Sequence, residues 1–261
     1  MCKAADEARA KRLLAEAKES KDFKEVARLI AISAPKASIS VRARQGLPNP
    51  AWRLNVRLKL GLPPMDSMPD FCAKCGYDFQ RGDDWHCLSC PSLRGVQHTR
   101  RHNEVVLCVS GFVDNVGGFS HVEPSGIGLA RKDRTRPDAD LYLSGRRFVI
   151  DASIVHPLAP SHTELAASKK LAVAMRRERE KRTRWEEKCA ARGAVFFPVV
   201  LETLGGFGGD SAELFKELCA APGIRFVSDN FSIRALRERL SLCVARWTAV
   251  CVRECMYSIS D

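Results

Sequence analysis

The feature that most constrains this chain is a dense run of cysteine and histidine residues between residues 70 and 103. The run contains Cys72, Cys75, His86, Cys87, Cys90, His98 and His102. Thiolate and imidazole are the ligands that tetrahedral zinc prefers, and such a site stabilises a fold that has little hydrophobic core. The run therefore predicts a small module that folds around Zn²⁺.

The spacing of the candidate ligands leaves three zinc sites open. The set that we prefer combines a cysteine knuckle with a distant His/Cys pair: Cys72, Cys75, His86 and Cys90. In a second set, Cys87 replaces His86 and gives two CxxC pairs. In a third set, Cys87 and Cys90 join His98 and His102, which are one helical turn apart if this stretch is helical.

The composition of the chain is that of a globular protein with a basic surface. Hydrophobic residues make up 45% of its 261 residues, and the N-terminus has no signal-peptide core. No apolar run approaches the roughly 18 residues of a membrane span. The net charge of +11 favours a polyanionic partner, nucleic acid before a membrane, so we expect no membrane partner. Without a secretory signal, the 11 cysteines are expected to be reduced thiols, some of them metal ligands.

Helices are predicted at both ends of the chain. Residues 3–33 are rich in helix formers, Pro35 ends this predicted helix, and residues 232–257 form the last helix. Residues 52–60 alternate like a strand but fit a short helix equally well. Residues 104–113 fit either the end of a helix or a short strand.

Strands and helices alternate in the second half of the chain. Residues 161–193 are typical of one long helix, with Ser161 at capping-box spacing from a glutamate and Gly193 at the end. The apolar residues 194–202 predict a short strand, and residues 210–221 predict a further helix. Strands interleaved with helices indicate the α/β class.

An acidic hairpin lies between the cysteine-rich block and the long helix. Its predicted parts are strand residues 140–143, the turn Ser144-Gly145 and strand residues 146–151. A two-residue turn at this place pairs Asp138 with Asp151 and puts their Cβ atoms roughly 4.5–5.5 Å apart. Facing carboxylates repel each other, and a bound cation such as Mg²⁺ relieves the repulsion. We therefore expect a divalent-metal site here.

Cationic side chains near the acid pair would suit the hydrolysis of a phosphodiester. A lysine beside the metal steadies the developing negative charge, and the following helix offers Lys169, Lys170 and Lys181. On a helical wheel Lys181 lies next to Trp185, at the edge of the apolar stripe. The residues expected to contact DNA are Arg101, His102, Arg131, Lys132, Arg134 and Arg136.

Several short motifs, in the right order between residues 52 and 205, resemble one protein family. RPD, FVIDASIVHPLAPSH, RREREKRTRW and FFPVVLETLGG resemble the C-terminal region of site-specific non-LTR retrotransposon proteins, in which a restriction-like endonuclease follows the reverse transcriptase. Upstream, VRLKLGLPP, CxxC…HxxxCPSLR and RRHNEVV resemble the zinc-knuckle region that precedes this nuclease.

This resemblance implies a PD-(D/E)xK restriction-endonuclease-like fold, which is a mixed sheet flanked by helices. It implies that Asp138 and Asp151 hold catalytic Mg²⁺ or Mn²⁺, and that Lys181 is the catalytic lysine, carried by a helix. Arg184 and Trp185 stand where the family's helical motif has Lys and Tyr. Supporting roles are implied for Arg184 and for Glu202.

The resemblance also implies an order of parts along the chain. These are a helical and linker segment at the end of a polymerase-associated region (1–65), a zinc-knuckle module (66–103), an endonuclease domain (104–230) and a C-terminal helix (231–261). In the family, the nuclease nicks double-stranded DNA and the freed 3′-hydroxyl primes copying of element RNA.

The chain has no room for a polymerase, so we expect a truncated or stand-alone C-terminal piece in the nucleus. Its expected partners are double-stranded DNA and, in addition, element RNA and a reverse transcriptase supplied elsewhere. The alternative is a catalytically inactive, zinc-stabilised module that binds DNA or RNA.

Overall fold

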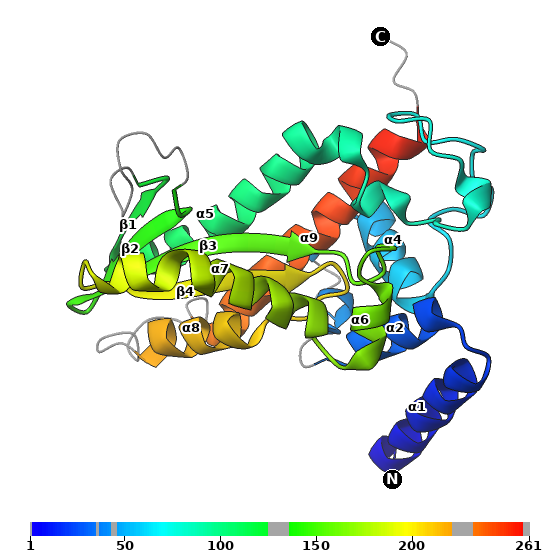
Figure 1. The fold of residues 1–261 in the computed structure, drawn as a ribbon, viewed down its shortest axis with the longest axis horizontal. Helices are drawn as coiled ribbons and strands as arrows, with labels where there is room; N and C mark the ends of the chain where they lie inside the picture. The colour runs from blue at the N-terminus through cyan, green and yellow to red at the C-terminus, as the bar shows by residue number, and fades with distance from the viewer. Residues whose placement is uncertain (1, 35–36, 43–45, 125–135, 221–231, 258–261) are drawn as a thin grey trace.

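The computed structural model describes residues 2–34, 37–42, 46–124, 136–220 and 232–257, and it shows an α/β protein in which helices flank a mixed four-stranded sheet (Figure 1). The strands are β1 (Phe119–Val122), β2 (Ala139–Leu143), β3 (Arg146–Val155) and β4 (Val195–Glu202). The α-helices are α1 (Cys2–Glu19), α2 (Phe23–Ile32), α3 (Ile39–Arg42), α4 (Asn49–Leu60), α5 (Thr99–Asn115), α6 (Thr163–Ser168), α7 (Ala172–Ala190), α8 (Gly209–Ala220) and α9 (Ile233–Met256).

The strands follow one another across the sheet in the order β1-β2-β3-β4. The β1–β2 and β2–β3 pairs are antiparallel, and β3–β4 is parallel. The parallel pair is joined by α6 and α7, as a crossover connection requires. Strand β1 was not among the predicted elements, because its four residues are mostly exposed and show no periodic pattern.

The hairpin prediction is confirmed in both its turn and its register. Leu143 pairs with Arg146 across the two-residue turn. Ser144 and Gly145 both have positive φ, +50° and +74°, as a type I′ turn requires. The same register carried past the end of β2 places Asp138 opposite Asp151.

The prediction of one long helix over residues 161–193 is wrong. The chain forms α6 and α7, separated where Lys169 is extended and Leu171 adopts a left-handed φ of +61°. Residue His162, rather than Ser161, precedes the first helical residue, and no side chain caps that end. The predicted stop is confirmed, because Gly193 has a φ of +67° just after the end of α7.

Both ambiguous stretches of the sequence are helical. Residues 52–60 belong to α4, which ends at Gly61 in the left-handed region at φ +73°. Residues 104–113 belong to α5, which starts at Thr99 and therefore crosses the expected boundary at residue 103.

The single helix predicted over residues 3–33 is wrong, because two helices form instead. Lys21 has a left-handed φ of +57° after the end of α1. Asp22 then caps α2, since its side chain accepts a hydrogen bond from the amide of Glu25.

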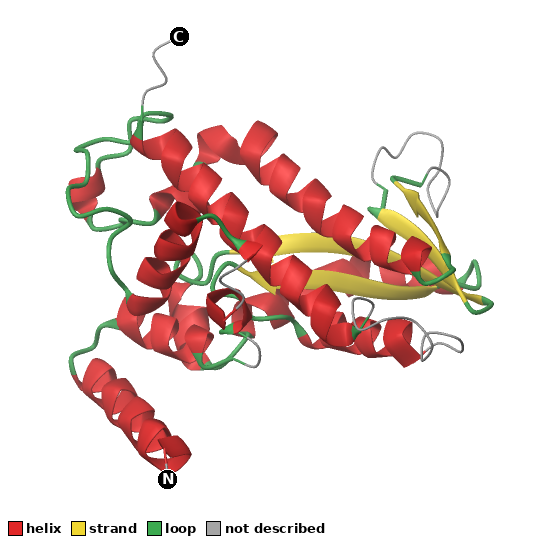
Figure 2. Cartoon of the chain, turned by 180° about the vertical axis from the view of Figure 1, so that it is seen from behind, coloured by secondary structure: helices red, strands yellow, loops and turns green. Residues whose placement is uncertain are grey.

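The two faces of the sheet pack against different helices. Phe148 and Ile150 of β3 lie in the main core with α5, α8 and α9, whereas Val149 packs against Trp185 of α7. Figure 2 shows α5 and α9 crossing the face of the sheet away from α7. Because side chains alternate along a strand, Asp151 shares the α7 face with Val149.

A second core joins the cysteine-rich block to helices from both ends of the chain. Leu88 of the block is buried with Ala31 of α2 and Val252 of α9. The amide of Ala73 also donates a hydrogen bond to the carbonyl of Cys255 (2.8 Å), at the end of α9. Among the helices described, none combines the length and apolar character that a membrane crossing requires.

Candidate metal centres

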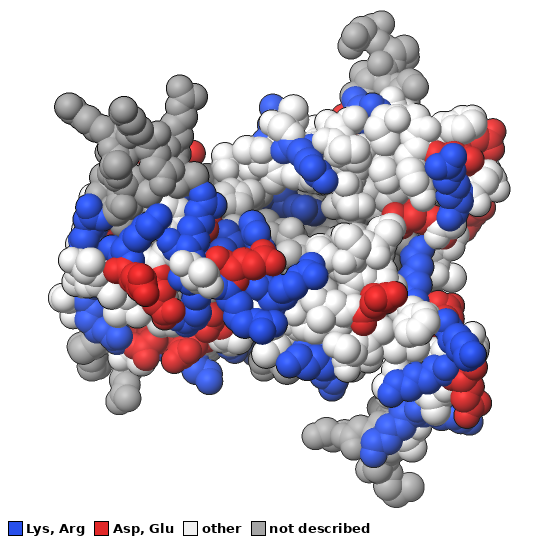
Figure 3. All heavy atoms as spheres, viewed as in Figure 1, with Lys and Arg blue, Asp and Glu red and all other residues white. Residues whose placement is uncertain are grey.

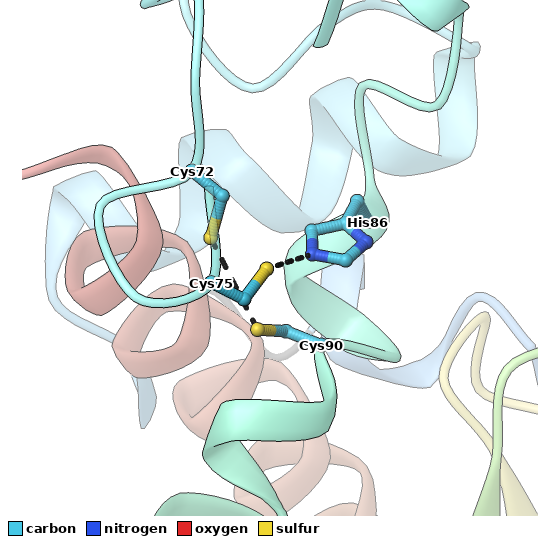
Figure 4. Close-up of side chains that lie close together, drawn as sticks. All are labelled: Cys72, Cys75, His86 and Cys90. Atoms are coloured by element: carbon cyan, nitrogen blue, oxygen red, sulfur yellow. Dashed lines mark hydrogen bonds between the residues drawn. The ribbon is translucent and has the colours of Figure 1, made fainter. Parts of the chain in front are cut away.

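The structure brings the preferred set of zinc ligands together in the cysteine-rich block. One ligand atom from each of Cys72, Cys75, His86 and Cys90 lies within 4.8 Å of all the others. The Sγ atoms of Cys72 and Cys90 are 4.0 Å apart, and Cys75 Sγ is 3.1 Å from His86 Nε2. Figure 4 shows these four side chains pointing toward a common centre.

Short-range backbone bonds shape this group. The Cys72 amide donates to the Tyr77 carbonyl, and the Gly76 amide donates to the Cys72 carbonyl, both at 2.8 Å. Gly76 sits at φ +70°, where a side chain would be strained, so the knuckle turns tightly. The Tyr77 ring stacks on the His86 ring with centroids 4.1 Å apart, which holds the imidazole toward the thiols.

The chemistry of the group suits a metal such as zinc. Three thiols and one imidazole form a common tetrahedral donor set. Hydrogen bonding from Cys255, with a contribution from His86, holds the pKa of the Cys90 thiol below its ordinary value, which favours the thiolate that binds metal. A Cys₃His group of this kind can bind Zn²⁺.

The alternative zinc ligands are not gathered with this group. Cys87 is fully buried in the second core, and burial raises the pKa of its thiol well above the ordinary value. Burial lowers the pKa of His98 to about 4, and its Nε2 has no hydrogen-bond partner among the described residues. His102 belongs to a different cluster.

That second cluster consists of His102, Asp138 and Asp151, whose ligand atoms also lie within 4.8 Å of one another. Asp138 Oδ2 is 2.9 Å from His102 Nε2 and accepts a 2.5 Å hydrogen bond from the amide of Ala152. The backbone of Asp138 is fixed in turn, since its amide donates to the carbonyl of Ile150 at 2.9 Å. The hairpin thus supplies both acids, and α5 supplies the imidazole.

Helix α7 supplies two further groups to the same acids. Lys181 Nζ lies 2.7 Å from Asp151 Oδ1, and Trp185 Nε1 donates to Asp151 Oδ2 at 2.9 Å. The two side chains are four residues apart, so they point from one face of the helix. The position of Lys181 at this site agrees with its place on the helical wheel.

The charges of this cluster depend on one another. Burial opposes ionisation of Asp138, but hydrogen bonds from His102 and the Ala152 amide outweigh it, so the pKa of Asp138 lies below its ordinary value. Burial raises the pKa of Asp151, and the charge of Asp138 adds to this against the opposing effect of Lys181. Burial lowers the pKa of Lys181. Two buried acids this close favour a bound cation.

The acidic cluster opens into a polar pocket of about 310 Å³. Its lining residues come from α5, the hairpin and α7: His102, Arg136, Asp151, Ala152, Ser153, Arg177, Glu180, Lys181 and Arg184. In Figure 3 the surface is hollowed between α5 and α7, and basic side chains gather around the hollow. We call this the acidic pocket.

Three arginines at the acidic pocket are held by neighbouring side chains. Arg177 donates to Ser153 Oγ at 3.2 Å and pairs with Glu180 at 2.8 Å. The Arg184 guanidinium lies over the Trp185 ring, 5.4 Å from its centroid. Arg136 pairs with a glutamate outside the pocket lining. The pocket therefore has an acidic floor and a basic rim.

Some residues predicted for the site lie elsewhere. Arg101 is 4% exposed, so the expectation that it contacts DNA is corrected. Glu202 is 1% exposed. It lies four residues beyond Pro198, the residue of β4 that pairs with Asp151, so about 13 Å of strand separate Glu202 from the level of Asp151. Arg131, Lys132 and Arg134 lie outside the described residues.

Glu202 acts on the framework and not on the acidic pocket. The amide of Ala174, in the first turn of α7, donates a hydrogen bond to its carboxylate. Burial raises the pKa of Glu202 to about 7. Glu202 therefore supports the end of the helix that carries Lys181.

Two contacts at the acids were not predicted, the indole donor of Trp185 and the imidazole of His102. Both residues had been noted in the sequence, but only the packing of α5 and α7 on the hairpin reveals their partners.

A comparison of the sequence with models of known protein families and with curated proteins found no match.

Proposed function

We propose that this protein is a divalent-metal-dependent DNA endonuclease of the PD-(D/E)xK type. The observation that supports this proposal is that Asp151 and Lys181 line one polar pocket, while a carboxylate oxygen of Asp138 lies within 4.8 Å of one from Asp151. These residues come from a loop, a strand and a helix, yet Lys181 Nζ is 2.7 Å from Asp151. Convergence of this kind is what metal-assisted phosphodiester hydrolysis requires.

The residues present fit a divalent cation. Asp138 and Asp151 are two close, largely buried acids beside a pocket with room for a phosphate group, and they would hold Mg²⁺ or Mn²⁺. The bound ion would lower the pKa of a water molecule and offset negative charge on the phosphate.

The side chains of the protein have separate tasks in this reaction. Lys181 is 6% exposed and fixed by Asp151, so its ammonium group is a preorganised positive charge beside the scissile phosphate. Trp185 holds the other oxygen of Asp151 and so fixes the orientation of the carboxylate. Arg136, Arg177 and Arg184 would contact backbone phosphates, which positions the duplex without reading its bases.

The biological context that we propose follows from the sequence resemblance. The nuclease would nick double-stranded target DNA in the nucleus, and the freed 3′-hydroxyl would prime reverse transcription of a non-LTR retrotransposon. Element RNA and a reverse transcriptase supplied elsewhere would be the further partners. The net charge of +11 supports a polyanionic partner.

A second candidate is a catalytically inactive module that binds DNA or RNA. It is favoured because protein groups already occupy the carboxylate oxygens of the two acids. Both oxygens of Asp151 accept hydrogen bonds, one from Lys181 and one from Trp185. Asp138 Oδ2 likewise faces His102 and the Ala152 amide. In that case the cluster of His102, Asp138 and Asp151 would stabilise the fold. The cysteine-rich block and the basic rim of the acidic pocket would bind nucleic acid.

A nicking assay on supercoiled plasmid distinguishes the two candidates. Wild type, Asp138→Asn and Asp151→Asn are incubated with Mg²⁺, with Mn²⁺ or with chelator. Asp140→Asn is the matched control. Asp140 is two residues from Asp138 and points to the same face of the hairpin, but its carboxylate bonds to Arg147 outside the pocket. We expect metal-dependent nicking by wild type and Asp140→Asn, and a loss of at least about 100-fold in the other two variants. If none of the four proteins nicks DNA and all of them still bind it, the binding module would be established instead.

A further inference from the structure

The acidic pocket has a third metal-ligating side chain that neither hairpin strand supplies. His102 Nε2 is 2.9 Å from Asp138 Oδ2, and the His102, Asp138 and Asp151 ligand atoms are all within 4.8 Å of one another. Building on the proposed metal-dependent nuclease, we propose that His102 is a direct ligand of the metal ion held by Asp138 and Asp151. The site would then prefer a first-row transition-metal ion such as Mn²⁺ to Mg²⁺.

The imidazole is oriented as a metal-binding histidine usually is. His102 Nδ1 lies 3.2 Å from Asn103 Oδ1, an acceptor that holds the proton on Nδ1. Nε2 is then the ring atom that faces the two acids. A hydrogen bond on the far nitrogen commonly fixes both the tautomer and the ring orientation of a ligating histidine.

The backbone of His102 is held in place by the rest of the fold. The residue lies in the first turn of α5, and Val105, Val109 and Phe112 anchor that helix in the main core. Its side chain is 29% exposed, on the side where the pocket opens. A metal ion bound by three side chains from one direction would keep positions open toward the pocket for water and a phosphate oxygen.

The ligand set determines which ion fits. Mg²⁺ binds carboxylate and water oxygens and is rarely held by imidazole, whereas first-row transition-metal ions accept imidazole nitrogen readily. One imidazole with two carboxylates therefore raises the affinity for Mn²⁺ more than the affinity for Mg²⁺.

The test measures Mn²⁺ binding by electron paramagnetic resonance. It uses the full chain loaded with one equivalent of zinc, in the absence of DNA. Wild type is compared with His102→Ala and with His102→Asn, which keeps a polar group near Asp138 if alanine impairs folding. His121→Ala is the control, because His121 is exposed on β1 and does not line the pocket. Competition with Mg²⁺ gives the ratio of the two affinities.

We expect wild type and His121→Ala to bind one Mn²⁺ with nitrogen coupling from an imidazole. Both His102 variants should lose that coupling and about 10- to 100-fold in Mn²⁺ affinity, with a smaller change for Mg²⁺. Unchanged Mn²⁺ affinity and nitrogen coupling in the His102 variants would overturn the inference, as would a wild type that binds no Mn²⁺. A wild type that binds Mn²⁺ through His102 but never nicks DNA would refute the proposed function alone.

Discussion

Trp185 Nε1 donates a hydrogen bond to Asp151 Oδ2 at 2.9 Å, so a residue of α7 holds the acid that β3 carries into the pocket. Trp185 is 1% exposed, and Lys181 holds the other oxygen of the same carboxylate at 2.7 Å. One helix therefore fixes both oxygens of Asp151.

Trp185→Phe removes this donor and leaves most of the aromatic packing. We expect a loss of about 1–3 kcal/mol in the free energy of unfolding, because a buried carboxylate oxygen loses its partner. Trp185→Tyr should retain more stability because its hydroxyl can donate. Urea unfolding followed by circular dichroism measures both. Trp247→Phe is the control, since its indole donates to Glu104, which is 31% exposed and open to water. An equal loss in the Trp185 and Trp247 variants would contradict a special role for the buried donor.

Zinc binding should depend on Cys72 and not on Cys87. Structural zinc contributes roughly 10–16 kcal/mol in small zinc modules, so Cys72→Ala is expected to lose the ion and to unfold the cysteine-rich block. Cys87→Ala should keep one zinc ion per chain, because Cys87 lies in the second core outside the ligand group. Metal content by atomic emission, together with thermal melting, checks this. Zinc loss in both variants would instead favour the CxxC…CxxC set. Zinc loss in Cys87→Ala with retention in Cys72→Ala would favour the set of Cys87, Cys90, His98 and His102.

Stability should depend on pH through Glu202. Burial raises its pKa from 4.5 to about 7, so between these values the folded chain holds a proton that the unfolded chain has released. The free energy of unfolding therefore falls as pH rises through this window, by up to ~3 kcal/mol from this group. Glu202→Gln should show a flatter dependence from pH 4.5 to 7. Denaturant unfolding at several pH values measures it, with the exposed Glu213→Gln as control. Parallel curves for wild type and Glu202→Gln would refute the assignment.

Arg101→Met should leave DNA affinity unchanged. The guanidinium is buried, and its Nε and Nη1 atoms have no hydrogen-bond partner among the described residues. Replacing an uncompensated buried charge by an apolar side chain of similar length is expected to raise the free energy of unfolding by about 1 kcal/mol. Fluorescence anisotropy with duplex DNA at two salt concentrations, and urea unfolding, test both parts. The exposed neighbour Arg100→Met is the control. Weaker DNA binding by Arg101→Met alone would restore the original expectation.

Local signals in the sequence were sufficient wherever neighbouring residues determine the structure. The turn Ser144-Gly145 fixed the hairpin register, because both residues accept the positive φ of a type I′ turn. The CxxC spacing and the His/Cys pair indicated the four side chains that the structure gathers, because all four lie on one short segment.

Local signals failed where tertiary packing overrides them. Residues 161–193 contain no Pro or Gly before Gly193, so nothing in the sequence predicted the break at Leu171. That break lets α6 pack on α2 while α7 lies along β3 and β4. Arg101 looked like a surface cation because charged residues are seldom buried, and only the packing of α5 shows otherwise.

The sequence by itself determined the α/β class, the hairpin that sets Asp138 opposite Asp151, and the donor types of the cysteine-rich block, since each depends on short-range spacing. Only the tertiary structure decided that His102 and Trp185 meet those acids. They lie 36 and 34 residues along the chain from their partners Asp138 and Asp151. Contacts over such separations depend on how α5 and α7 pack on the sheet, and no local pattern encodes the angle or the depth of that packing.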